Sequence, residues 1–496
     1  MSQENTIHVE PFAIDSFTDA VVAASGGKKS NAQVRYLARY LDRLGARTVV
    51  RETRYVDRHY MDEYALFYSR MLHAPTNTVV RMHFFAKRFD DAALRRWMMD
   101  GFRGGKGIAD KIASEAGTYF GFTCIRPIVD SPIGRTVISR WPDDTKTRDI
   151  WAVGTYGVHI GNLPFEVTGL PFQQQEAAVG ACATVALWSA LSRVARHERM
   201  RAPTPAEITE AVERPIQPHV RAPLAPTTGF TADQICAATQ LFGFTPVTIT
   251  GDRPEVLALA LHTYLQSGIP VVVVLRGSGR GHAVTALGFQ LSGSERGDLE
   301  SLVPTRSQQL HKIYVHDDRL GPYARATLTP FRVSNVESMP DMEGMRFDIA
   351  DEKGEAEHWI VEMLVAAVYP KVRLSIASLV GVAAAIQPVV EEAVGQDAFD
   401  LRADFRYDRA GDYLASLTRV VAPAQGAELA TRVAMSRWCA IVRWSLRDEQ
   451  LIELVFDTTD ILRGDCDGQL VAVVARAPGA RAAARTLADR YGVPAA

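Results

Sequence analysis

The hydrophobic and polar positions of this chain change their period several times. Residues 31–45, NAQVRYLARYLDRLG, repeat apolar side chains every three or four positions, which predicts an amphipathic helix that Ser30 can cap. Two runs that are rich in β-branched and aromatic residues, 78–87 and 118–129, predict strands. We therefore expect a mixed α/β unit over residues 1–150.

The pattern changes from about residue 151. Residues 181–199, ACATVALWSALSRVARHER, form a run of apolar and small residues that predicts a helix. Residues 201–230 then hold six prolines, too many for a regular element, which predicts an irregular loop or a wrapped arm. We expect this Pro-rich segment to be an insertion in a middle domain that covers residues 151–340.

The rest of the middle domain predicts two helices and then a sheet. The helical segments are TADQICAATQLFG at 231–243 and RPEVLALALHTYLQSG at 253–268. Three runs rich in β-branched residues come next and predict successive strands of one sheet. These runs are IPVVVVLRG at 269–277, GHAVTALGFQ at 281–290 and HKIYVHDD at 311–318.

The last part, residues 341–496, predicts a C-terminal α/β unit. It begins with two apolar segments that we expect to be helices, 357–369 and 376–394. Three later segments are typical of strands because they are short and rich in β-branched and aromatic residues. These segments are SRWCAIVRWSLR at 436–447, QLIELVFDTT at 450–459 and GQLVAVVAR at 468–476.

Composition sets limits on the class of protein. A chain of 496 residues is long enough for two to four packed units, and its 47% hydrophobic and 23% charged residues are ordinary for a globular protein. The formal net charge of −2 argues against nucleic acid or an anionic membrane as the main partner. We expect a folded protein that binds neither.

The cysteines and the N-terminus indicate the compartment. The five cysteines are odd in number and include no CxxC pair, which favours a reducing compartment over a disulfide framework. The N-terminus lacks the basic start and apolar run of a secretory signal. The weakly polar run at 374–386 is too short to span a bilayer, so we interpret it as a buried helix. We expect a cytoplasmic protein without a membrane segment.

Several common catalytic motifs are absent from the sequence. No GxxxxGK[ST] occurs, so phosphates have no P-loop to bind and an NTPase is not expected. No HExxH and no paired Cys/His spacing occurs, which argues against a zinc hydrolase. We expect neither a cofactor nor a metal.

Cys182 is placed where a thiol can become a nucleophile. It opens the apolar helix after Gly180, and the free N–H groups and dipole of a helix start favour the thiolate. Its neighbours Ala181 and Ala183 are small enough for a substrate to approach. The alternative is a buried structural cysteine, which the segment alone does not exclude.

His282 is the candidate general base. It lies at the start of a predicted strand, after glycines at 277, 279 and 281 that leave room for a cleft. A histidine on the surface or in the core is the alternative. The glycines also resemble a phosphate-binding loop, but no helix follows them.

An acid and an amide complete the candidate constellation. Asp317 ends the strand HKIYVHDD and can accept the imidazole N–H and orient the ring, with Asp318 as its rival and two solvated acids as the alternative to both. Gln175 is the nearest of three glutamines before the cysteine, and its amide could hold an oxyanion together with the Cys182 N–H.

Along the chain, the glutamines come first, then the cysteine at a helix start, then the histidine strand and the strand that ends in an acid. With its candidate residues in this order, the stretch from about 170 to 325 resembles the papain-like cysteine peptidases, particularly their compact bacterial members. The matching segments are FQQQEAAVGACATVALW, SGIPVVVVLRGSGRGHAVTALGF and YVHDDRLGPY. The resemblance implies a helix with Cys182 packed on an antiparallel sheet with His282, and hydrolysis of amide bonds through a thioester. Gln175 is one residue further from the cysteine than in papain itself. The fold expected is α+β, a papain-like core between mixed α/β units.

The expected function is therefore cysteine-dependent hydrolysis of a protein or peptide, with Cys182 as nucleophile, His282 as base and Asp317 as the orienting acid. The flanking units could recognise a specific partner protein. Deamidases, transglutaminases, amidases and acyltransferases use the same groups and stay open as alternatives. A non-catalytic protein-binding module is the alternative from a different class.

Overall fold

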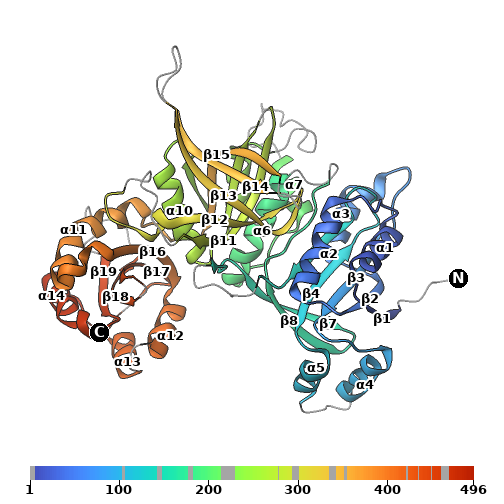
Figure 1. Cartoon of the computed structure of the whole chain (residues 1–496), viewed down its shortest axis with the longest axis horizontal. Coiled ribbons are helices and arrows are strands. Elements are labelled where there is room, and N and C mark those ends of the chain that lie inside the picture. Colours follow the sequence, from blue (N-terminus) through green and yellow to red (C-terminus); the bar gives the residue numbers. More distant parts are fainter. Residues whose placement is uncertain are drawn as a thin grey trace.

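The computed structural model divides the chain into an N-terminal, a central and a C-terminal unit (Figure 1). The described residues are 6–102, 107–141, 148–176, 182–213, 230–277, 279–292, 301–333, 342–350, 355–420, 423–433, 435–447, 449–459 and 469–495. Helices and antiparallel sheets both contribute a large share of the chain. The class is α+β, as expected from the sequence.

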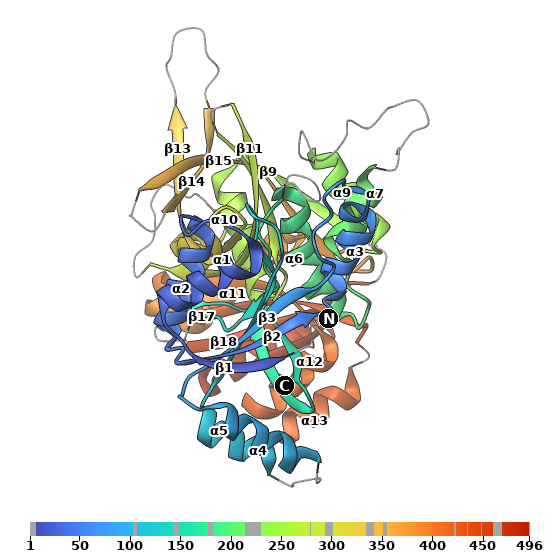
Figure 2. The same cartoon turned by 90° about the vertical axis from the view of Figure 1, so that its right-hand side faces the viewer.

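The N-terminal unit is built on a five-stranded antiparallel sheet in the order β1-β2-β3-β4-β5. Its strands are β1 Ile7–Pro11, β2 Thr48–Tyr55, β3 Val79–Phe85, β4 Tyr119–Ile125 and β5 Ile133–Ile138. Its helices are α1 Ile14–Ser25, α2 Ala32–Leu44, α3 Arg58–Leu66, α4 Asp91–Phe102 and α5 Ile108–Ala116. Helices α1 and α2 cover one face of this sheet, and α4 and α5 lie on the other side (Figure 2). Successive strand residues point to opposite faces, so Phe84 packs with α1 and α2, and Phe85 packs with α4 and α5.

Helix α2 shows how sequence decides one of these elements. Its apolar positions, such as Leu37 and Leu41, are fully buried, and the helix ends at Gly45, whose φ of 90° is left-handed. The cap expected at Ser30 is wrong by one residue. Asn31 is the N-cap, and its side chain accepts a hydrogen bond from the Val34 amide.

The central unit is a closed antiparallel barrel with helices around it. The barrel strands are β10 Val271–Arg276, β11 Gly281–Leu291, β12 Leu310–Asp317, β13 Gly321–Val333, β14 Met342–Ala350 and β15 Ala356–Val368. The ladder closes because β10 pairs with β11 on one edge and with β15 on the other. The three strands expected after residue 268 are therefore neighbours in one sheet, which confirms that prediction.

Further elements surround the barrel. Strand β9, Thr245–Thr250, extends the sheet beyond β15, and the short β6, Arg148–Asp149, pairs with β11. The helices of this unit are α6 Cys182–His197, α7 Pro205–Glu213, α9 Ala232–Leu241 and α10 Pro254–Gln266. The hairpin of β7 Gly154–Ile160 and β8 Leu163–Gly169 packs its apolar side chains into the core of the N-terminal unit.

Segment 357–369 is a strand, not the expected helix. It forms most of β15, which pairs with β10 on one edge and with β14 and β9 on the other. A strand that is buried between neighbours carries apolar residues on both faces, so its pattern does not alternate and resembles that of a buried helix. The barrel consequently extends to Val368, beyond the boundary expected at residue 340.

The Pro-rich segment, expected to be an irregular loop or a wrapped arm, contains a helix. Helix α7 begins at Pro205, a position where the missing N–H has no intrahelical acceptor and the fixed φ suits the helix. Thr204 and Glu207 cap this start, with the Thr204 amide donating to the Glu207 carboxylate over 2.9 Å. Four of the six prolines, at 215, 218, 223 and 226, lie outside the described residues.

The C-terminal unit is a four-stranded antiparallel sheet in the order β16-β17-β18-β19 with helices on both faces (Figure 1). The strands are β16 Leu401–Arg409, β17 Trp438–Leu446, β18 Glu449–Asp457 and β19 Leu470–Ala475. The helices are α11 Ile376–Val394, α12 Ala410–Val420, α13 Pro423–Arg432 and α14 Arg481–Tyr491. The three strands and the helix expected at 376–394 are present.

Helix α11 is, within the described part of the chain, the one helix long and apolar enough to cross a membrane. Its side chains pack into the C-terminal core, where Leu379, Ala383 and Ile386 are almost fully buried. The Trp444 indole N–H of β17 also donates to the Gln387 side chain over 2.7 Å. These contacts are those of a core helix that covers a sheet.

Candidate active site

Cys182 is the first residue of α6 and is half-buried. Two buried hydrogen bonds hold the first turns of this helix. The Thr285 hydroxyl of β11 donates to the Ala186 carbonyl over 2.7 Å, and the Ser189 hydroxyl donates to the Pro171 carbonyl over 2.6 Å. The helix that carries the thiol is thereby fixed to the strand that carries His282.

His282 is the second residue of β11 and is only 4% exposed. Its Nε2 lies 3.1 Å from Asp317 Oδ1. Burial lowers the pKa of His282, but the Asp317 carboxylate and a hydrogen bond with the Cys182 side chain outweigh burial and raise the pKa well above 6.5. Since Nε2 faces Asp317, Nδ1 is the ring nitrogen left for the thiol. The arrangement favours a protonated imidazole beside Cys182.

Asp317 is held by the turn that follows β12. Its Oδ1 also accepts the Arg319 backbone N–H over 2.9 Å, a side-chain turn that fixes the carboxylate. Burial raises the pKa of Asp317, but His282 and Arg319 outweigh it and lower the pKa below 3.8. A buried carboxylate that stays ionised beside a histidine can fix the tautomer of the ring and stabilise the imidazolium.

Asp318, the rival acid, is buried next to the same ring. Its Oδ1 lies 3.8 Å from His282 Nε2, beyond hydrogen-bond distance, and neither of its oxygens has a hydrogen-bond partner among the described residues. Burial raises the pKa of Asp318 to about 7. The hydrogen bond to the histidine therefore belongs to Asp317.

The three glutamines before the nucleophile differ in their contacts. Gln173 donates to the Glu63 carboxylate over 2.5 Å, and Gln174 donates to the Asp130 carbonyl over 3.2 Å, so both bind the N-terminal unit. Gln175 is half-buried and makes no hydrogen bond to another described residue. Residues 177–181, which connect this segment to Cys182, lie outside the described residues.

A buried ion pair supports the segment 173–176, which precedes the nucleophile. No pattern in the sequence predicts this ion pair. Glu63 of α3 and Arg126, after β4, are both almost fully buried, with 3.0 Å between Oε2 and Nη1. Arg126 also donates to the Gln174 carbonyl over 3.0 Å, and the Tyr68 hydroxyl donates to Glu176. The N-terminal unit thus anchors the segment that leads to Cys182. Glu63 and Arg126 are 63 residues apart, and no local pattern connects them.

Trp359 of β15 covers the histidine and was also missed. Its ring centroid lies 5.3 Å from that of His282, with 37° between the planes. Gly277 permits this approach, because a Cβ there would come within 2.8 Å of the indole. The Arg280 guanidinium lies over the indole, 5.1 Å from the ring centroid. The tryptophan shields the His282–Asp317 pair from water, which strengthens their interaction.

Three of these side chains could also hold a cation. The nearest ligand-type atoms of His282, Asp317 and Asp318 all lie within 4.8 Å of one another. Imidazole and carboxylate are ligands that zinc accepts. A metal at this point would take the same Nε2 that pairs with Asp317, so metal binding and the cysteine site compete for one atom.

Chemically, the described residues bring together a thiol at a helix start, a histidine with a raised pKa and a buried carboxylate. Such a set can produce a thiolate, shuttle one proton and stabilise the resulting charges.

No protein-family model matches the chain, and none of the curated proteins matches it either.

Proposed function

We propose that this chain is a cysteine hydrolase, and a peptidase first, in which Cys182 is the nucleophile, His282 the base and acid, and Asp317 the orienting residue. The observation that supports it most is the buried His282–Asp317 hydrogen bond of 3.1 Å, beside a Cys182 side chain that raises the pKa of the same histidine. Two of the three groups come from the closed barrel and the third from the helix packed on it. A papain-like arrangement of core helix and sheet is part of the proposal.

The pairing of Cys182 with His282 suggests how protons move during the proposed reaction. His282 takes the proton of the Cys182 thiol and becomes an imidazolium, which its raised pKa favours, and the sulfur attacks the substrate carbonyl. His282 gives its proton to the leaving amine, which leaves a thioester on Cys182. His282 then takes a proton from water, which hydrolyses the thioester. The Cys182 N–H and the Gln175 side chain are the candidates for holding the oxyanion.

The acceptor in the second step decides the reaction class. Water gives a peptidase, a deamidase or an amidase, whereas an amine gives a transglutaminase, and the triad is the same in each case. The proposed substrate is a protein or peptide, recognised with the help of the N-terminal and C-terminal units. A reducing, cytoplasmic setting is proposed with it, since all four cysteines in the described residues are free.

Labelling with a thiol-reactive amide-mimic probe at neutral pH tests the proposal. We expect modification at Cys182 and none at Cys236, a matched control that is also half-buried on a helix but whose pKa burial raises. Cleavage of a peptide library by the wild type and not by Cys182→Ala would identify a peptidase. A folded protein without labelling at Cys182 would contradict the proposal and favour the protein-binding module.

A further inference from the structure

A pocket of about 490 Å³ lies between the N-terminal unit and the nucleophile helix, away from the triad residues. It is within the size range of small-molecule sites. Its walls come from α3, β5, β7, α6 and the chain just after α6. The lining residues include His59, Arg135, Tyr156, Trp188, Arg196 and Arg199.

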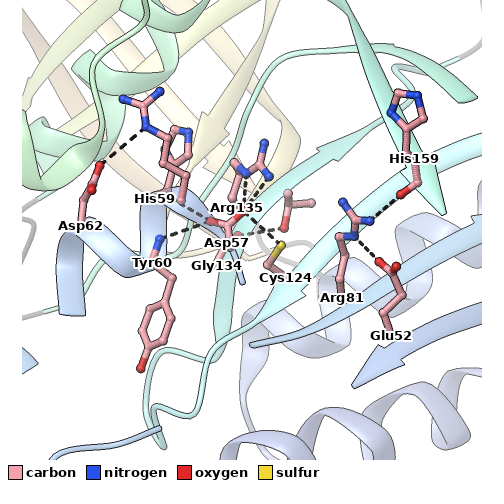
Figure 3. Close-up of polar contacts among 12 residues, drawn as sticks. Glu52, Asp57, His59, Tyr60, Asp62, Arg81, Cys124, Gly134, Arg135 and His159 are labelled. Atoms are coloured by element: carbon pink, nitrogen blue, oxygen red, sulfur yellow. Dashed lines mark hydrogen bonds and ion pairs between the residues drawn. The ribbon is translucent and has the colours of Figure 1, made fainter. Parts of the chain in front are cut away.

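The charge of this pocket is positive. Among the described residues that line it there is no Asp or Glu. Arg135 is neutralised by Asp57, 2.6 Å away, which also accepts the His59 and Tyr60 amides (Figure 3). Arg196 and Arg199 are exposed and form no ion pair with another described residue. The pocket therefore carries two positive charges that the described chain does not compensate.

The same walls hold polar atoms without partners. The Trp188 indole N–H, the Tyr156 hydroxyl and His59 Nδ1 are shielded from solvent and have no hydrogen-bond partner among the described residues. Trp188 itself is fully buried. These atoms lie behind the surface of the pocket, so the polar groups that are open to a ligand are the exposed guanidinium groups of Arg196 and Arg199. Burial lowers the pKa of His59 to about 3, so its ring is neutral and adds no charge.

Backbone strain adds an independent observation. Arg199 follows the last turn of α6 with a φ of 58°, a left-handed conformation that glycine usually adopts at a helix end. The Met200 amide closes that end on the Ala195 carbonyl over 2.8 Å. An arginine is strained at this position, and its side chain lines the pocket. The guanidinium of Arg196, which also lines the pocket, lies 4.6 Å from the centroid of the Tyr156 ring.

We propose that this pocket binds a small molecule that carries a phosphate group. Two uncompensated guanidinium groups match the double negative charge of a phosphate monoester, and their planar donors fit its oxygens. The volume and the aromatic walls leave room for an organic part beside the phosphate. A ligand there contacts both the N-terminal unit and α6, so it stabilises the contact between that unit and the nucleophile helix. The proposal does not depend on the proposed hydrolase activity.

Calorimetric titration of the full chain at constant ionic strength tests the site. The probes are pyrophosphate, glucose 6-phosphate and, as the neutral control, glucose. We expect saturable binding of at least one phosphate probe and none of glucose. Binding of glucose 6-phosphate alone indicates an organic phosphate, and binding of pyrophosphate alone a phosphate chain. Absence of saturable binding by both phosphate probes at millimolar concentration would overturn the proposal.

Two variants assign the binding to this pocket. Arg199→Gly removes the side chain and also relieves the left-handed strain, so it should fold at least as well as the wild type. Arg447→Gly is the matched control, since Arg447 has a φ of 54° and lies in the β17–β18 turn of the C-terminal unit. We expect Arg199→Gly and Arg196→Gln each to weaken binding by about tenfold or more. Unchanged affinity in both would show that the pocket is not the site.

Discussion

Substitution of Asp318 by Asn tests the electrostatics of the active site most directly. The wild-type carboxyl is buried and has no hydrogen-bond partner in the part of the chain that the structure describes, and burial raises its pKa to about 7 from 3.8. Between these two pH values the folded protein binds one proton that the unfolded chain has released. Stability in the wild type therefore falls as pH rises from about 4 to 7, and this contribution is absent in the variant.

The size of the effect follows from the same numbers. A displacement of the pKa from 3.8 to about 7 corresponds to about 4 kcal/mol in total, or about 1.4 kcal/mol for each pH unit. The Asn amide adds donors without partners, which costs about 1–3 kcal/mol at every pH. The pH dependence of the difference, and not its absolute value, is therefore the informative quantity.

Hydrogen exchange of peptides from the β12–β13 hairpin, followed by mass spectrometry, measures this difference in the barrel alone. Comparison of variant and wild type at one pH cancels the intrinsic exchange rate. We expect the protection of Asp318→Asn relative to wild type to rise about tenfold per pH unit between pH 5 and 7 and then to level off. Asp317→Asn should lower protection throughout, because the lowered pKa of Asp317 stabilises the fold above pH 3.8.

A relative protection that is the same at pH 5 and pH 8 would refute this reasoning. It would mean that Asp318 is ionised in the folded protein over the whole range. Asp318 would then be a charged partner of His282, and the assignment of Asp317 as the orienting acid would have to be reconsidered.

Further predictions concern turnover. His282→Ala and Asp317→Ala should each lower kcat by about 100-fold or more without unfolding, while Asp318→Ala has a smaller effect, as cleavage assays and circular dichroism would show. Because Asp317 raises the pKa of His282, Asp317→Asn should shift the alkaline limb of kcat/KM to lower pH; an unchanged limb would argue against the pairing. Thr285→Val removes the hydrogen bond to α6 and should lower the stability of the central unit by about 1 kcal/mol in denaturant titrations, with a lower kcat. Activity should survive EDTA, whereas loss that zinc restores would favour a metal at His282.

Local patterns in the sequence were sufficient to place the candidate triad on its elements. The helix starts at Cys182, His282 lies at the start of its strand and Asp317 ends the next strand. Each depends on signals from neighbouring residues, such as β-branched runs and small residues before a helix. The antiparallel pairing of β11 with β12 then brings His282 and Asp317 together.

Local patterns predicted the wrong element where a strand is buried on both faces, because apolar and polar residues then no longer alternate. The second half of β15 is buried on both faces, so residues 364–368 do not alternate and the segment at 357–369 predicted a helix. Trp359 lies in this strand, and its contact with His282 was therefore missed. The helix at Pro205 was missed because the density of prolines outweighed the capping residues before it.

The sequence by itself determined the types of the elements that carry Cys182, His282 and Asp317, and the residue types that make a thiol nucleophile possible. Only the tertiary structure decided which acid bonds to the histidine, since Asp317 and Asp318 are adjacent and differ by the turn at Arg319. It also decided that Glu63 and Arg126 hold the loop before Cys182. These choices depend on pairings between distant segments, whose geometry is set by how strands close the barrel and not by any periodicity along the chain.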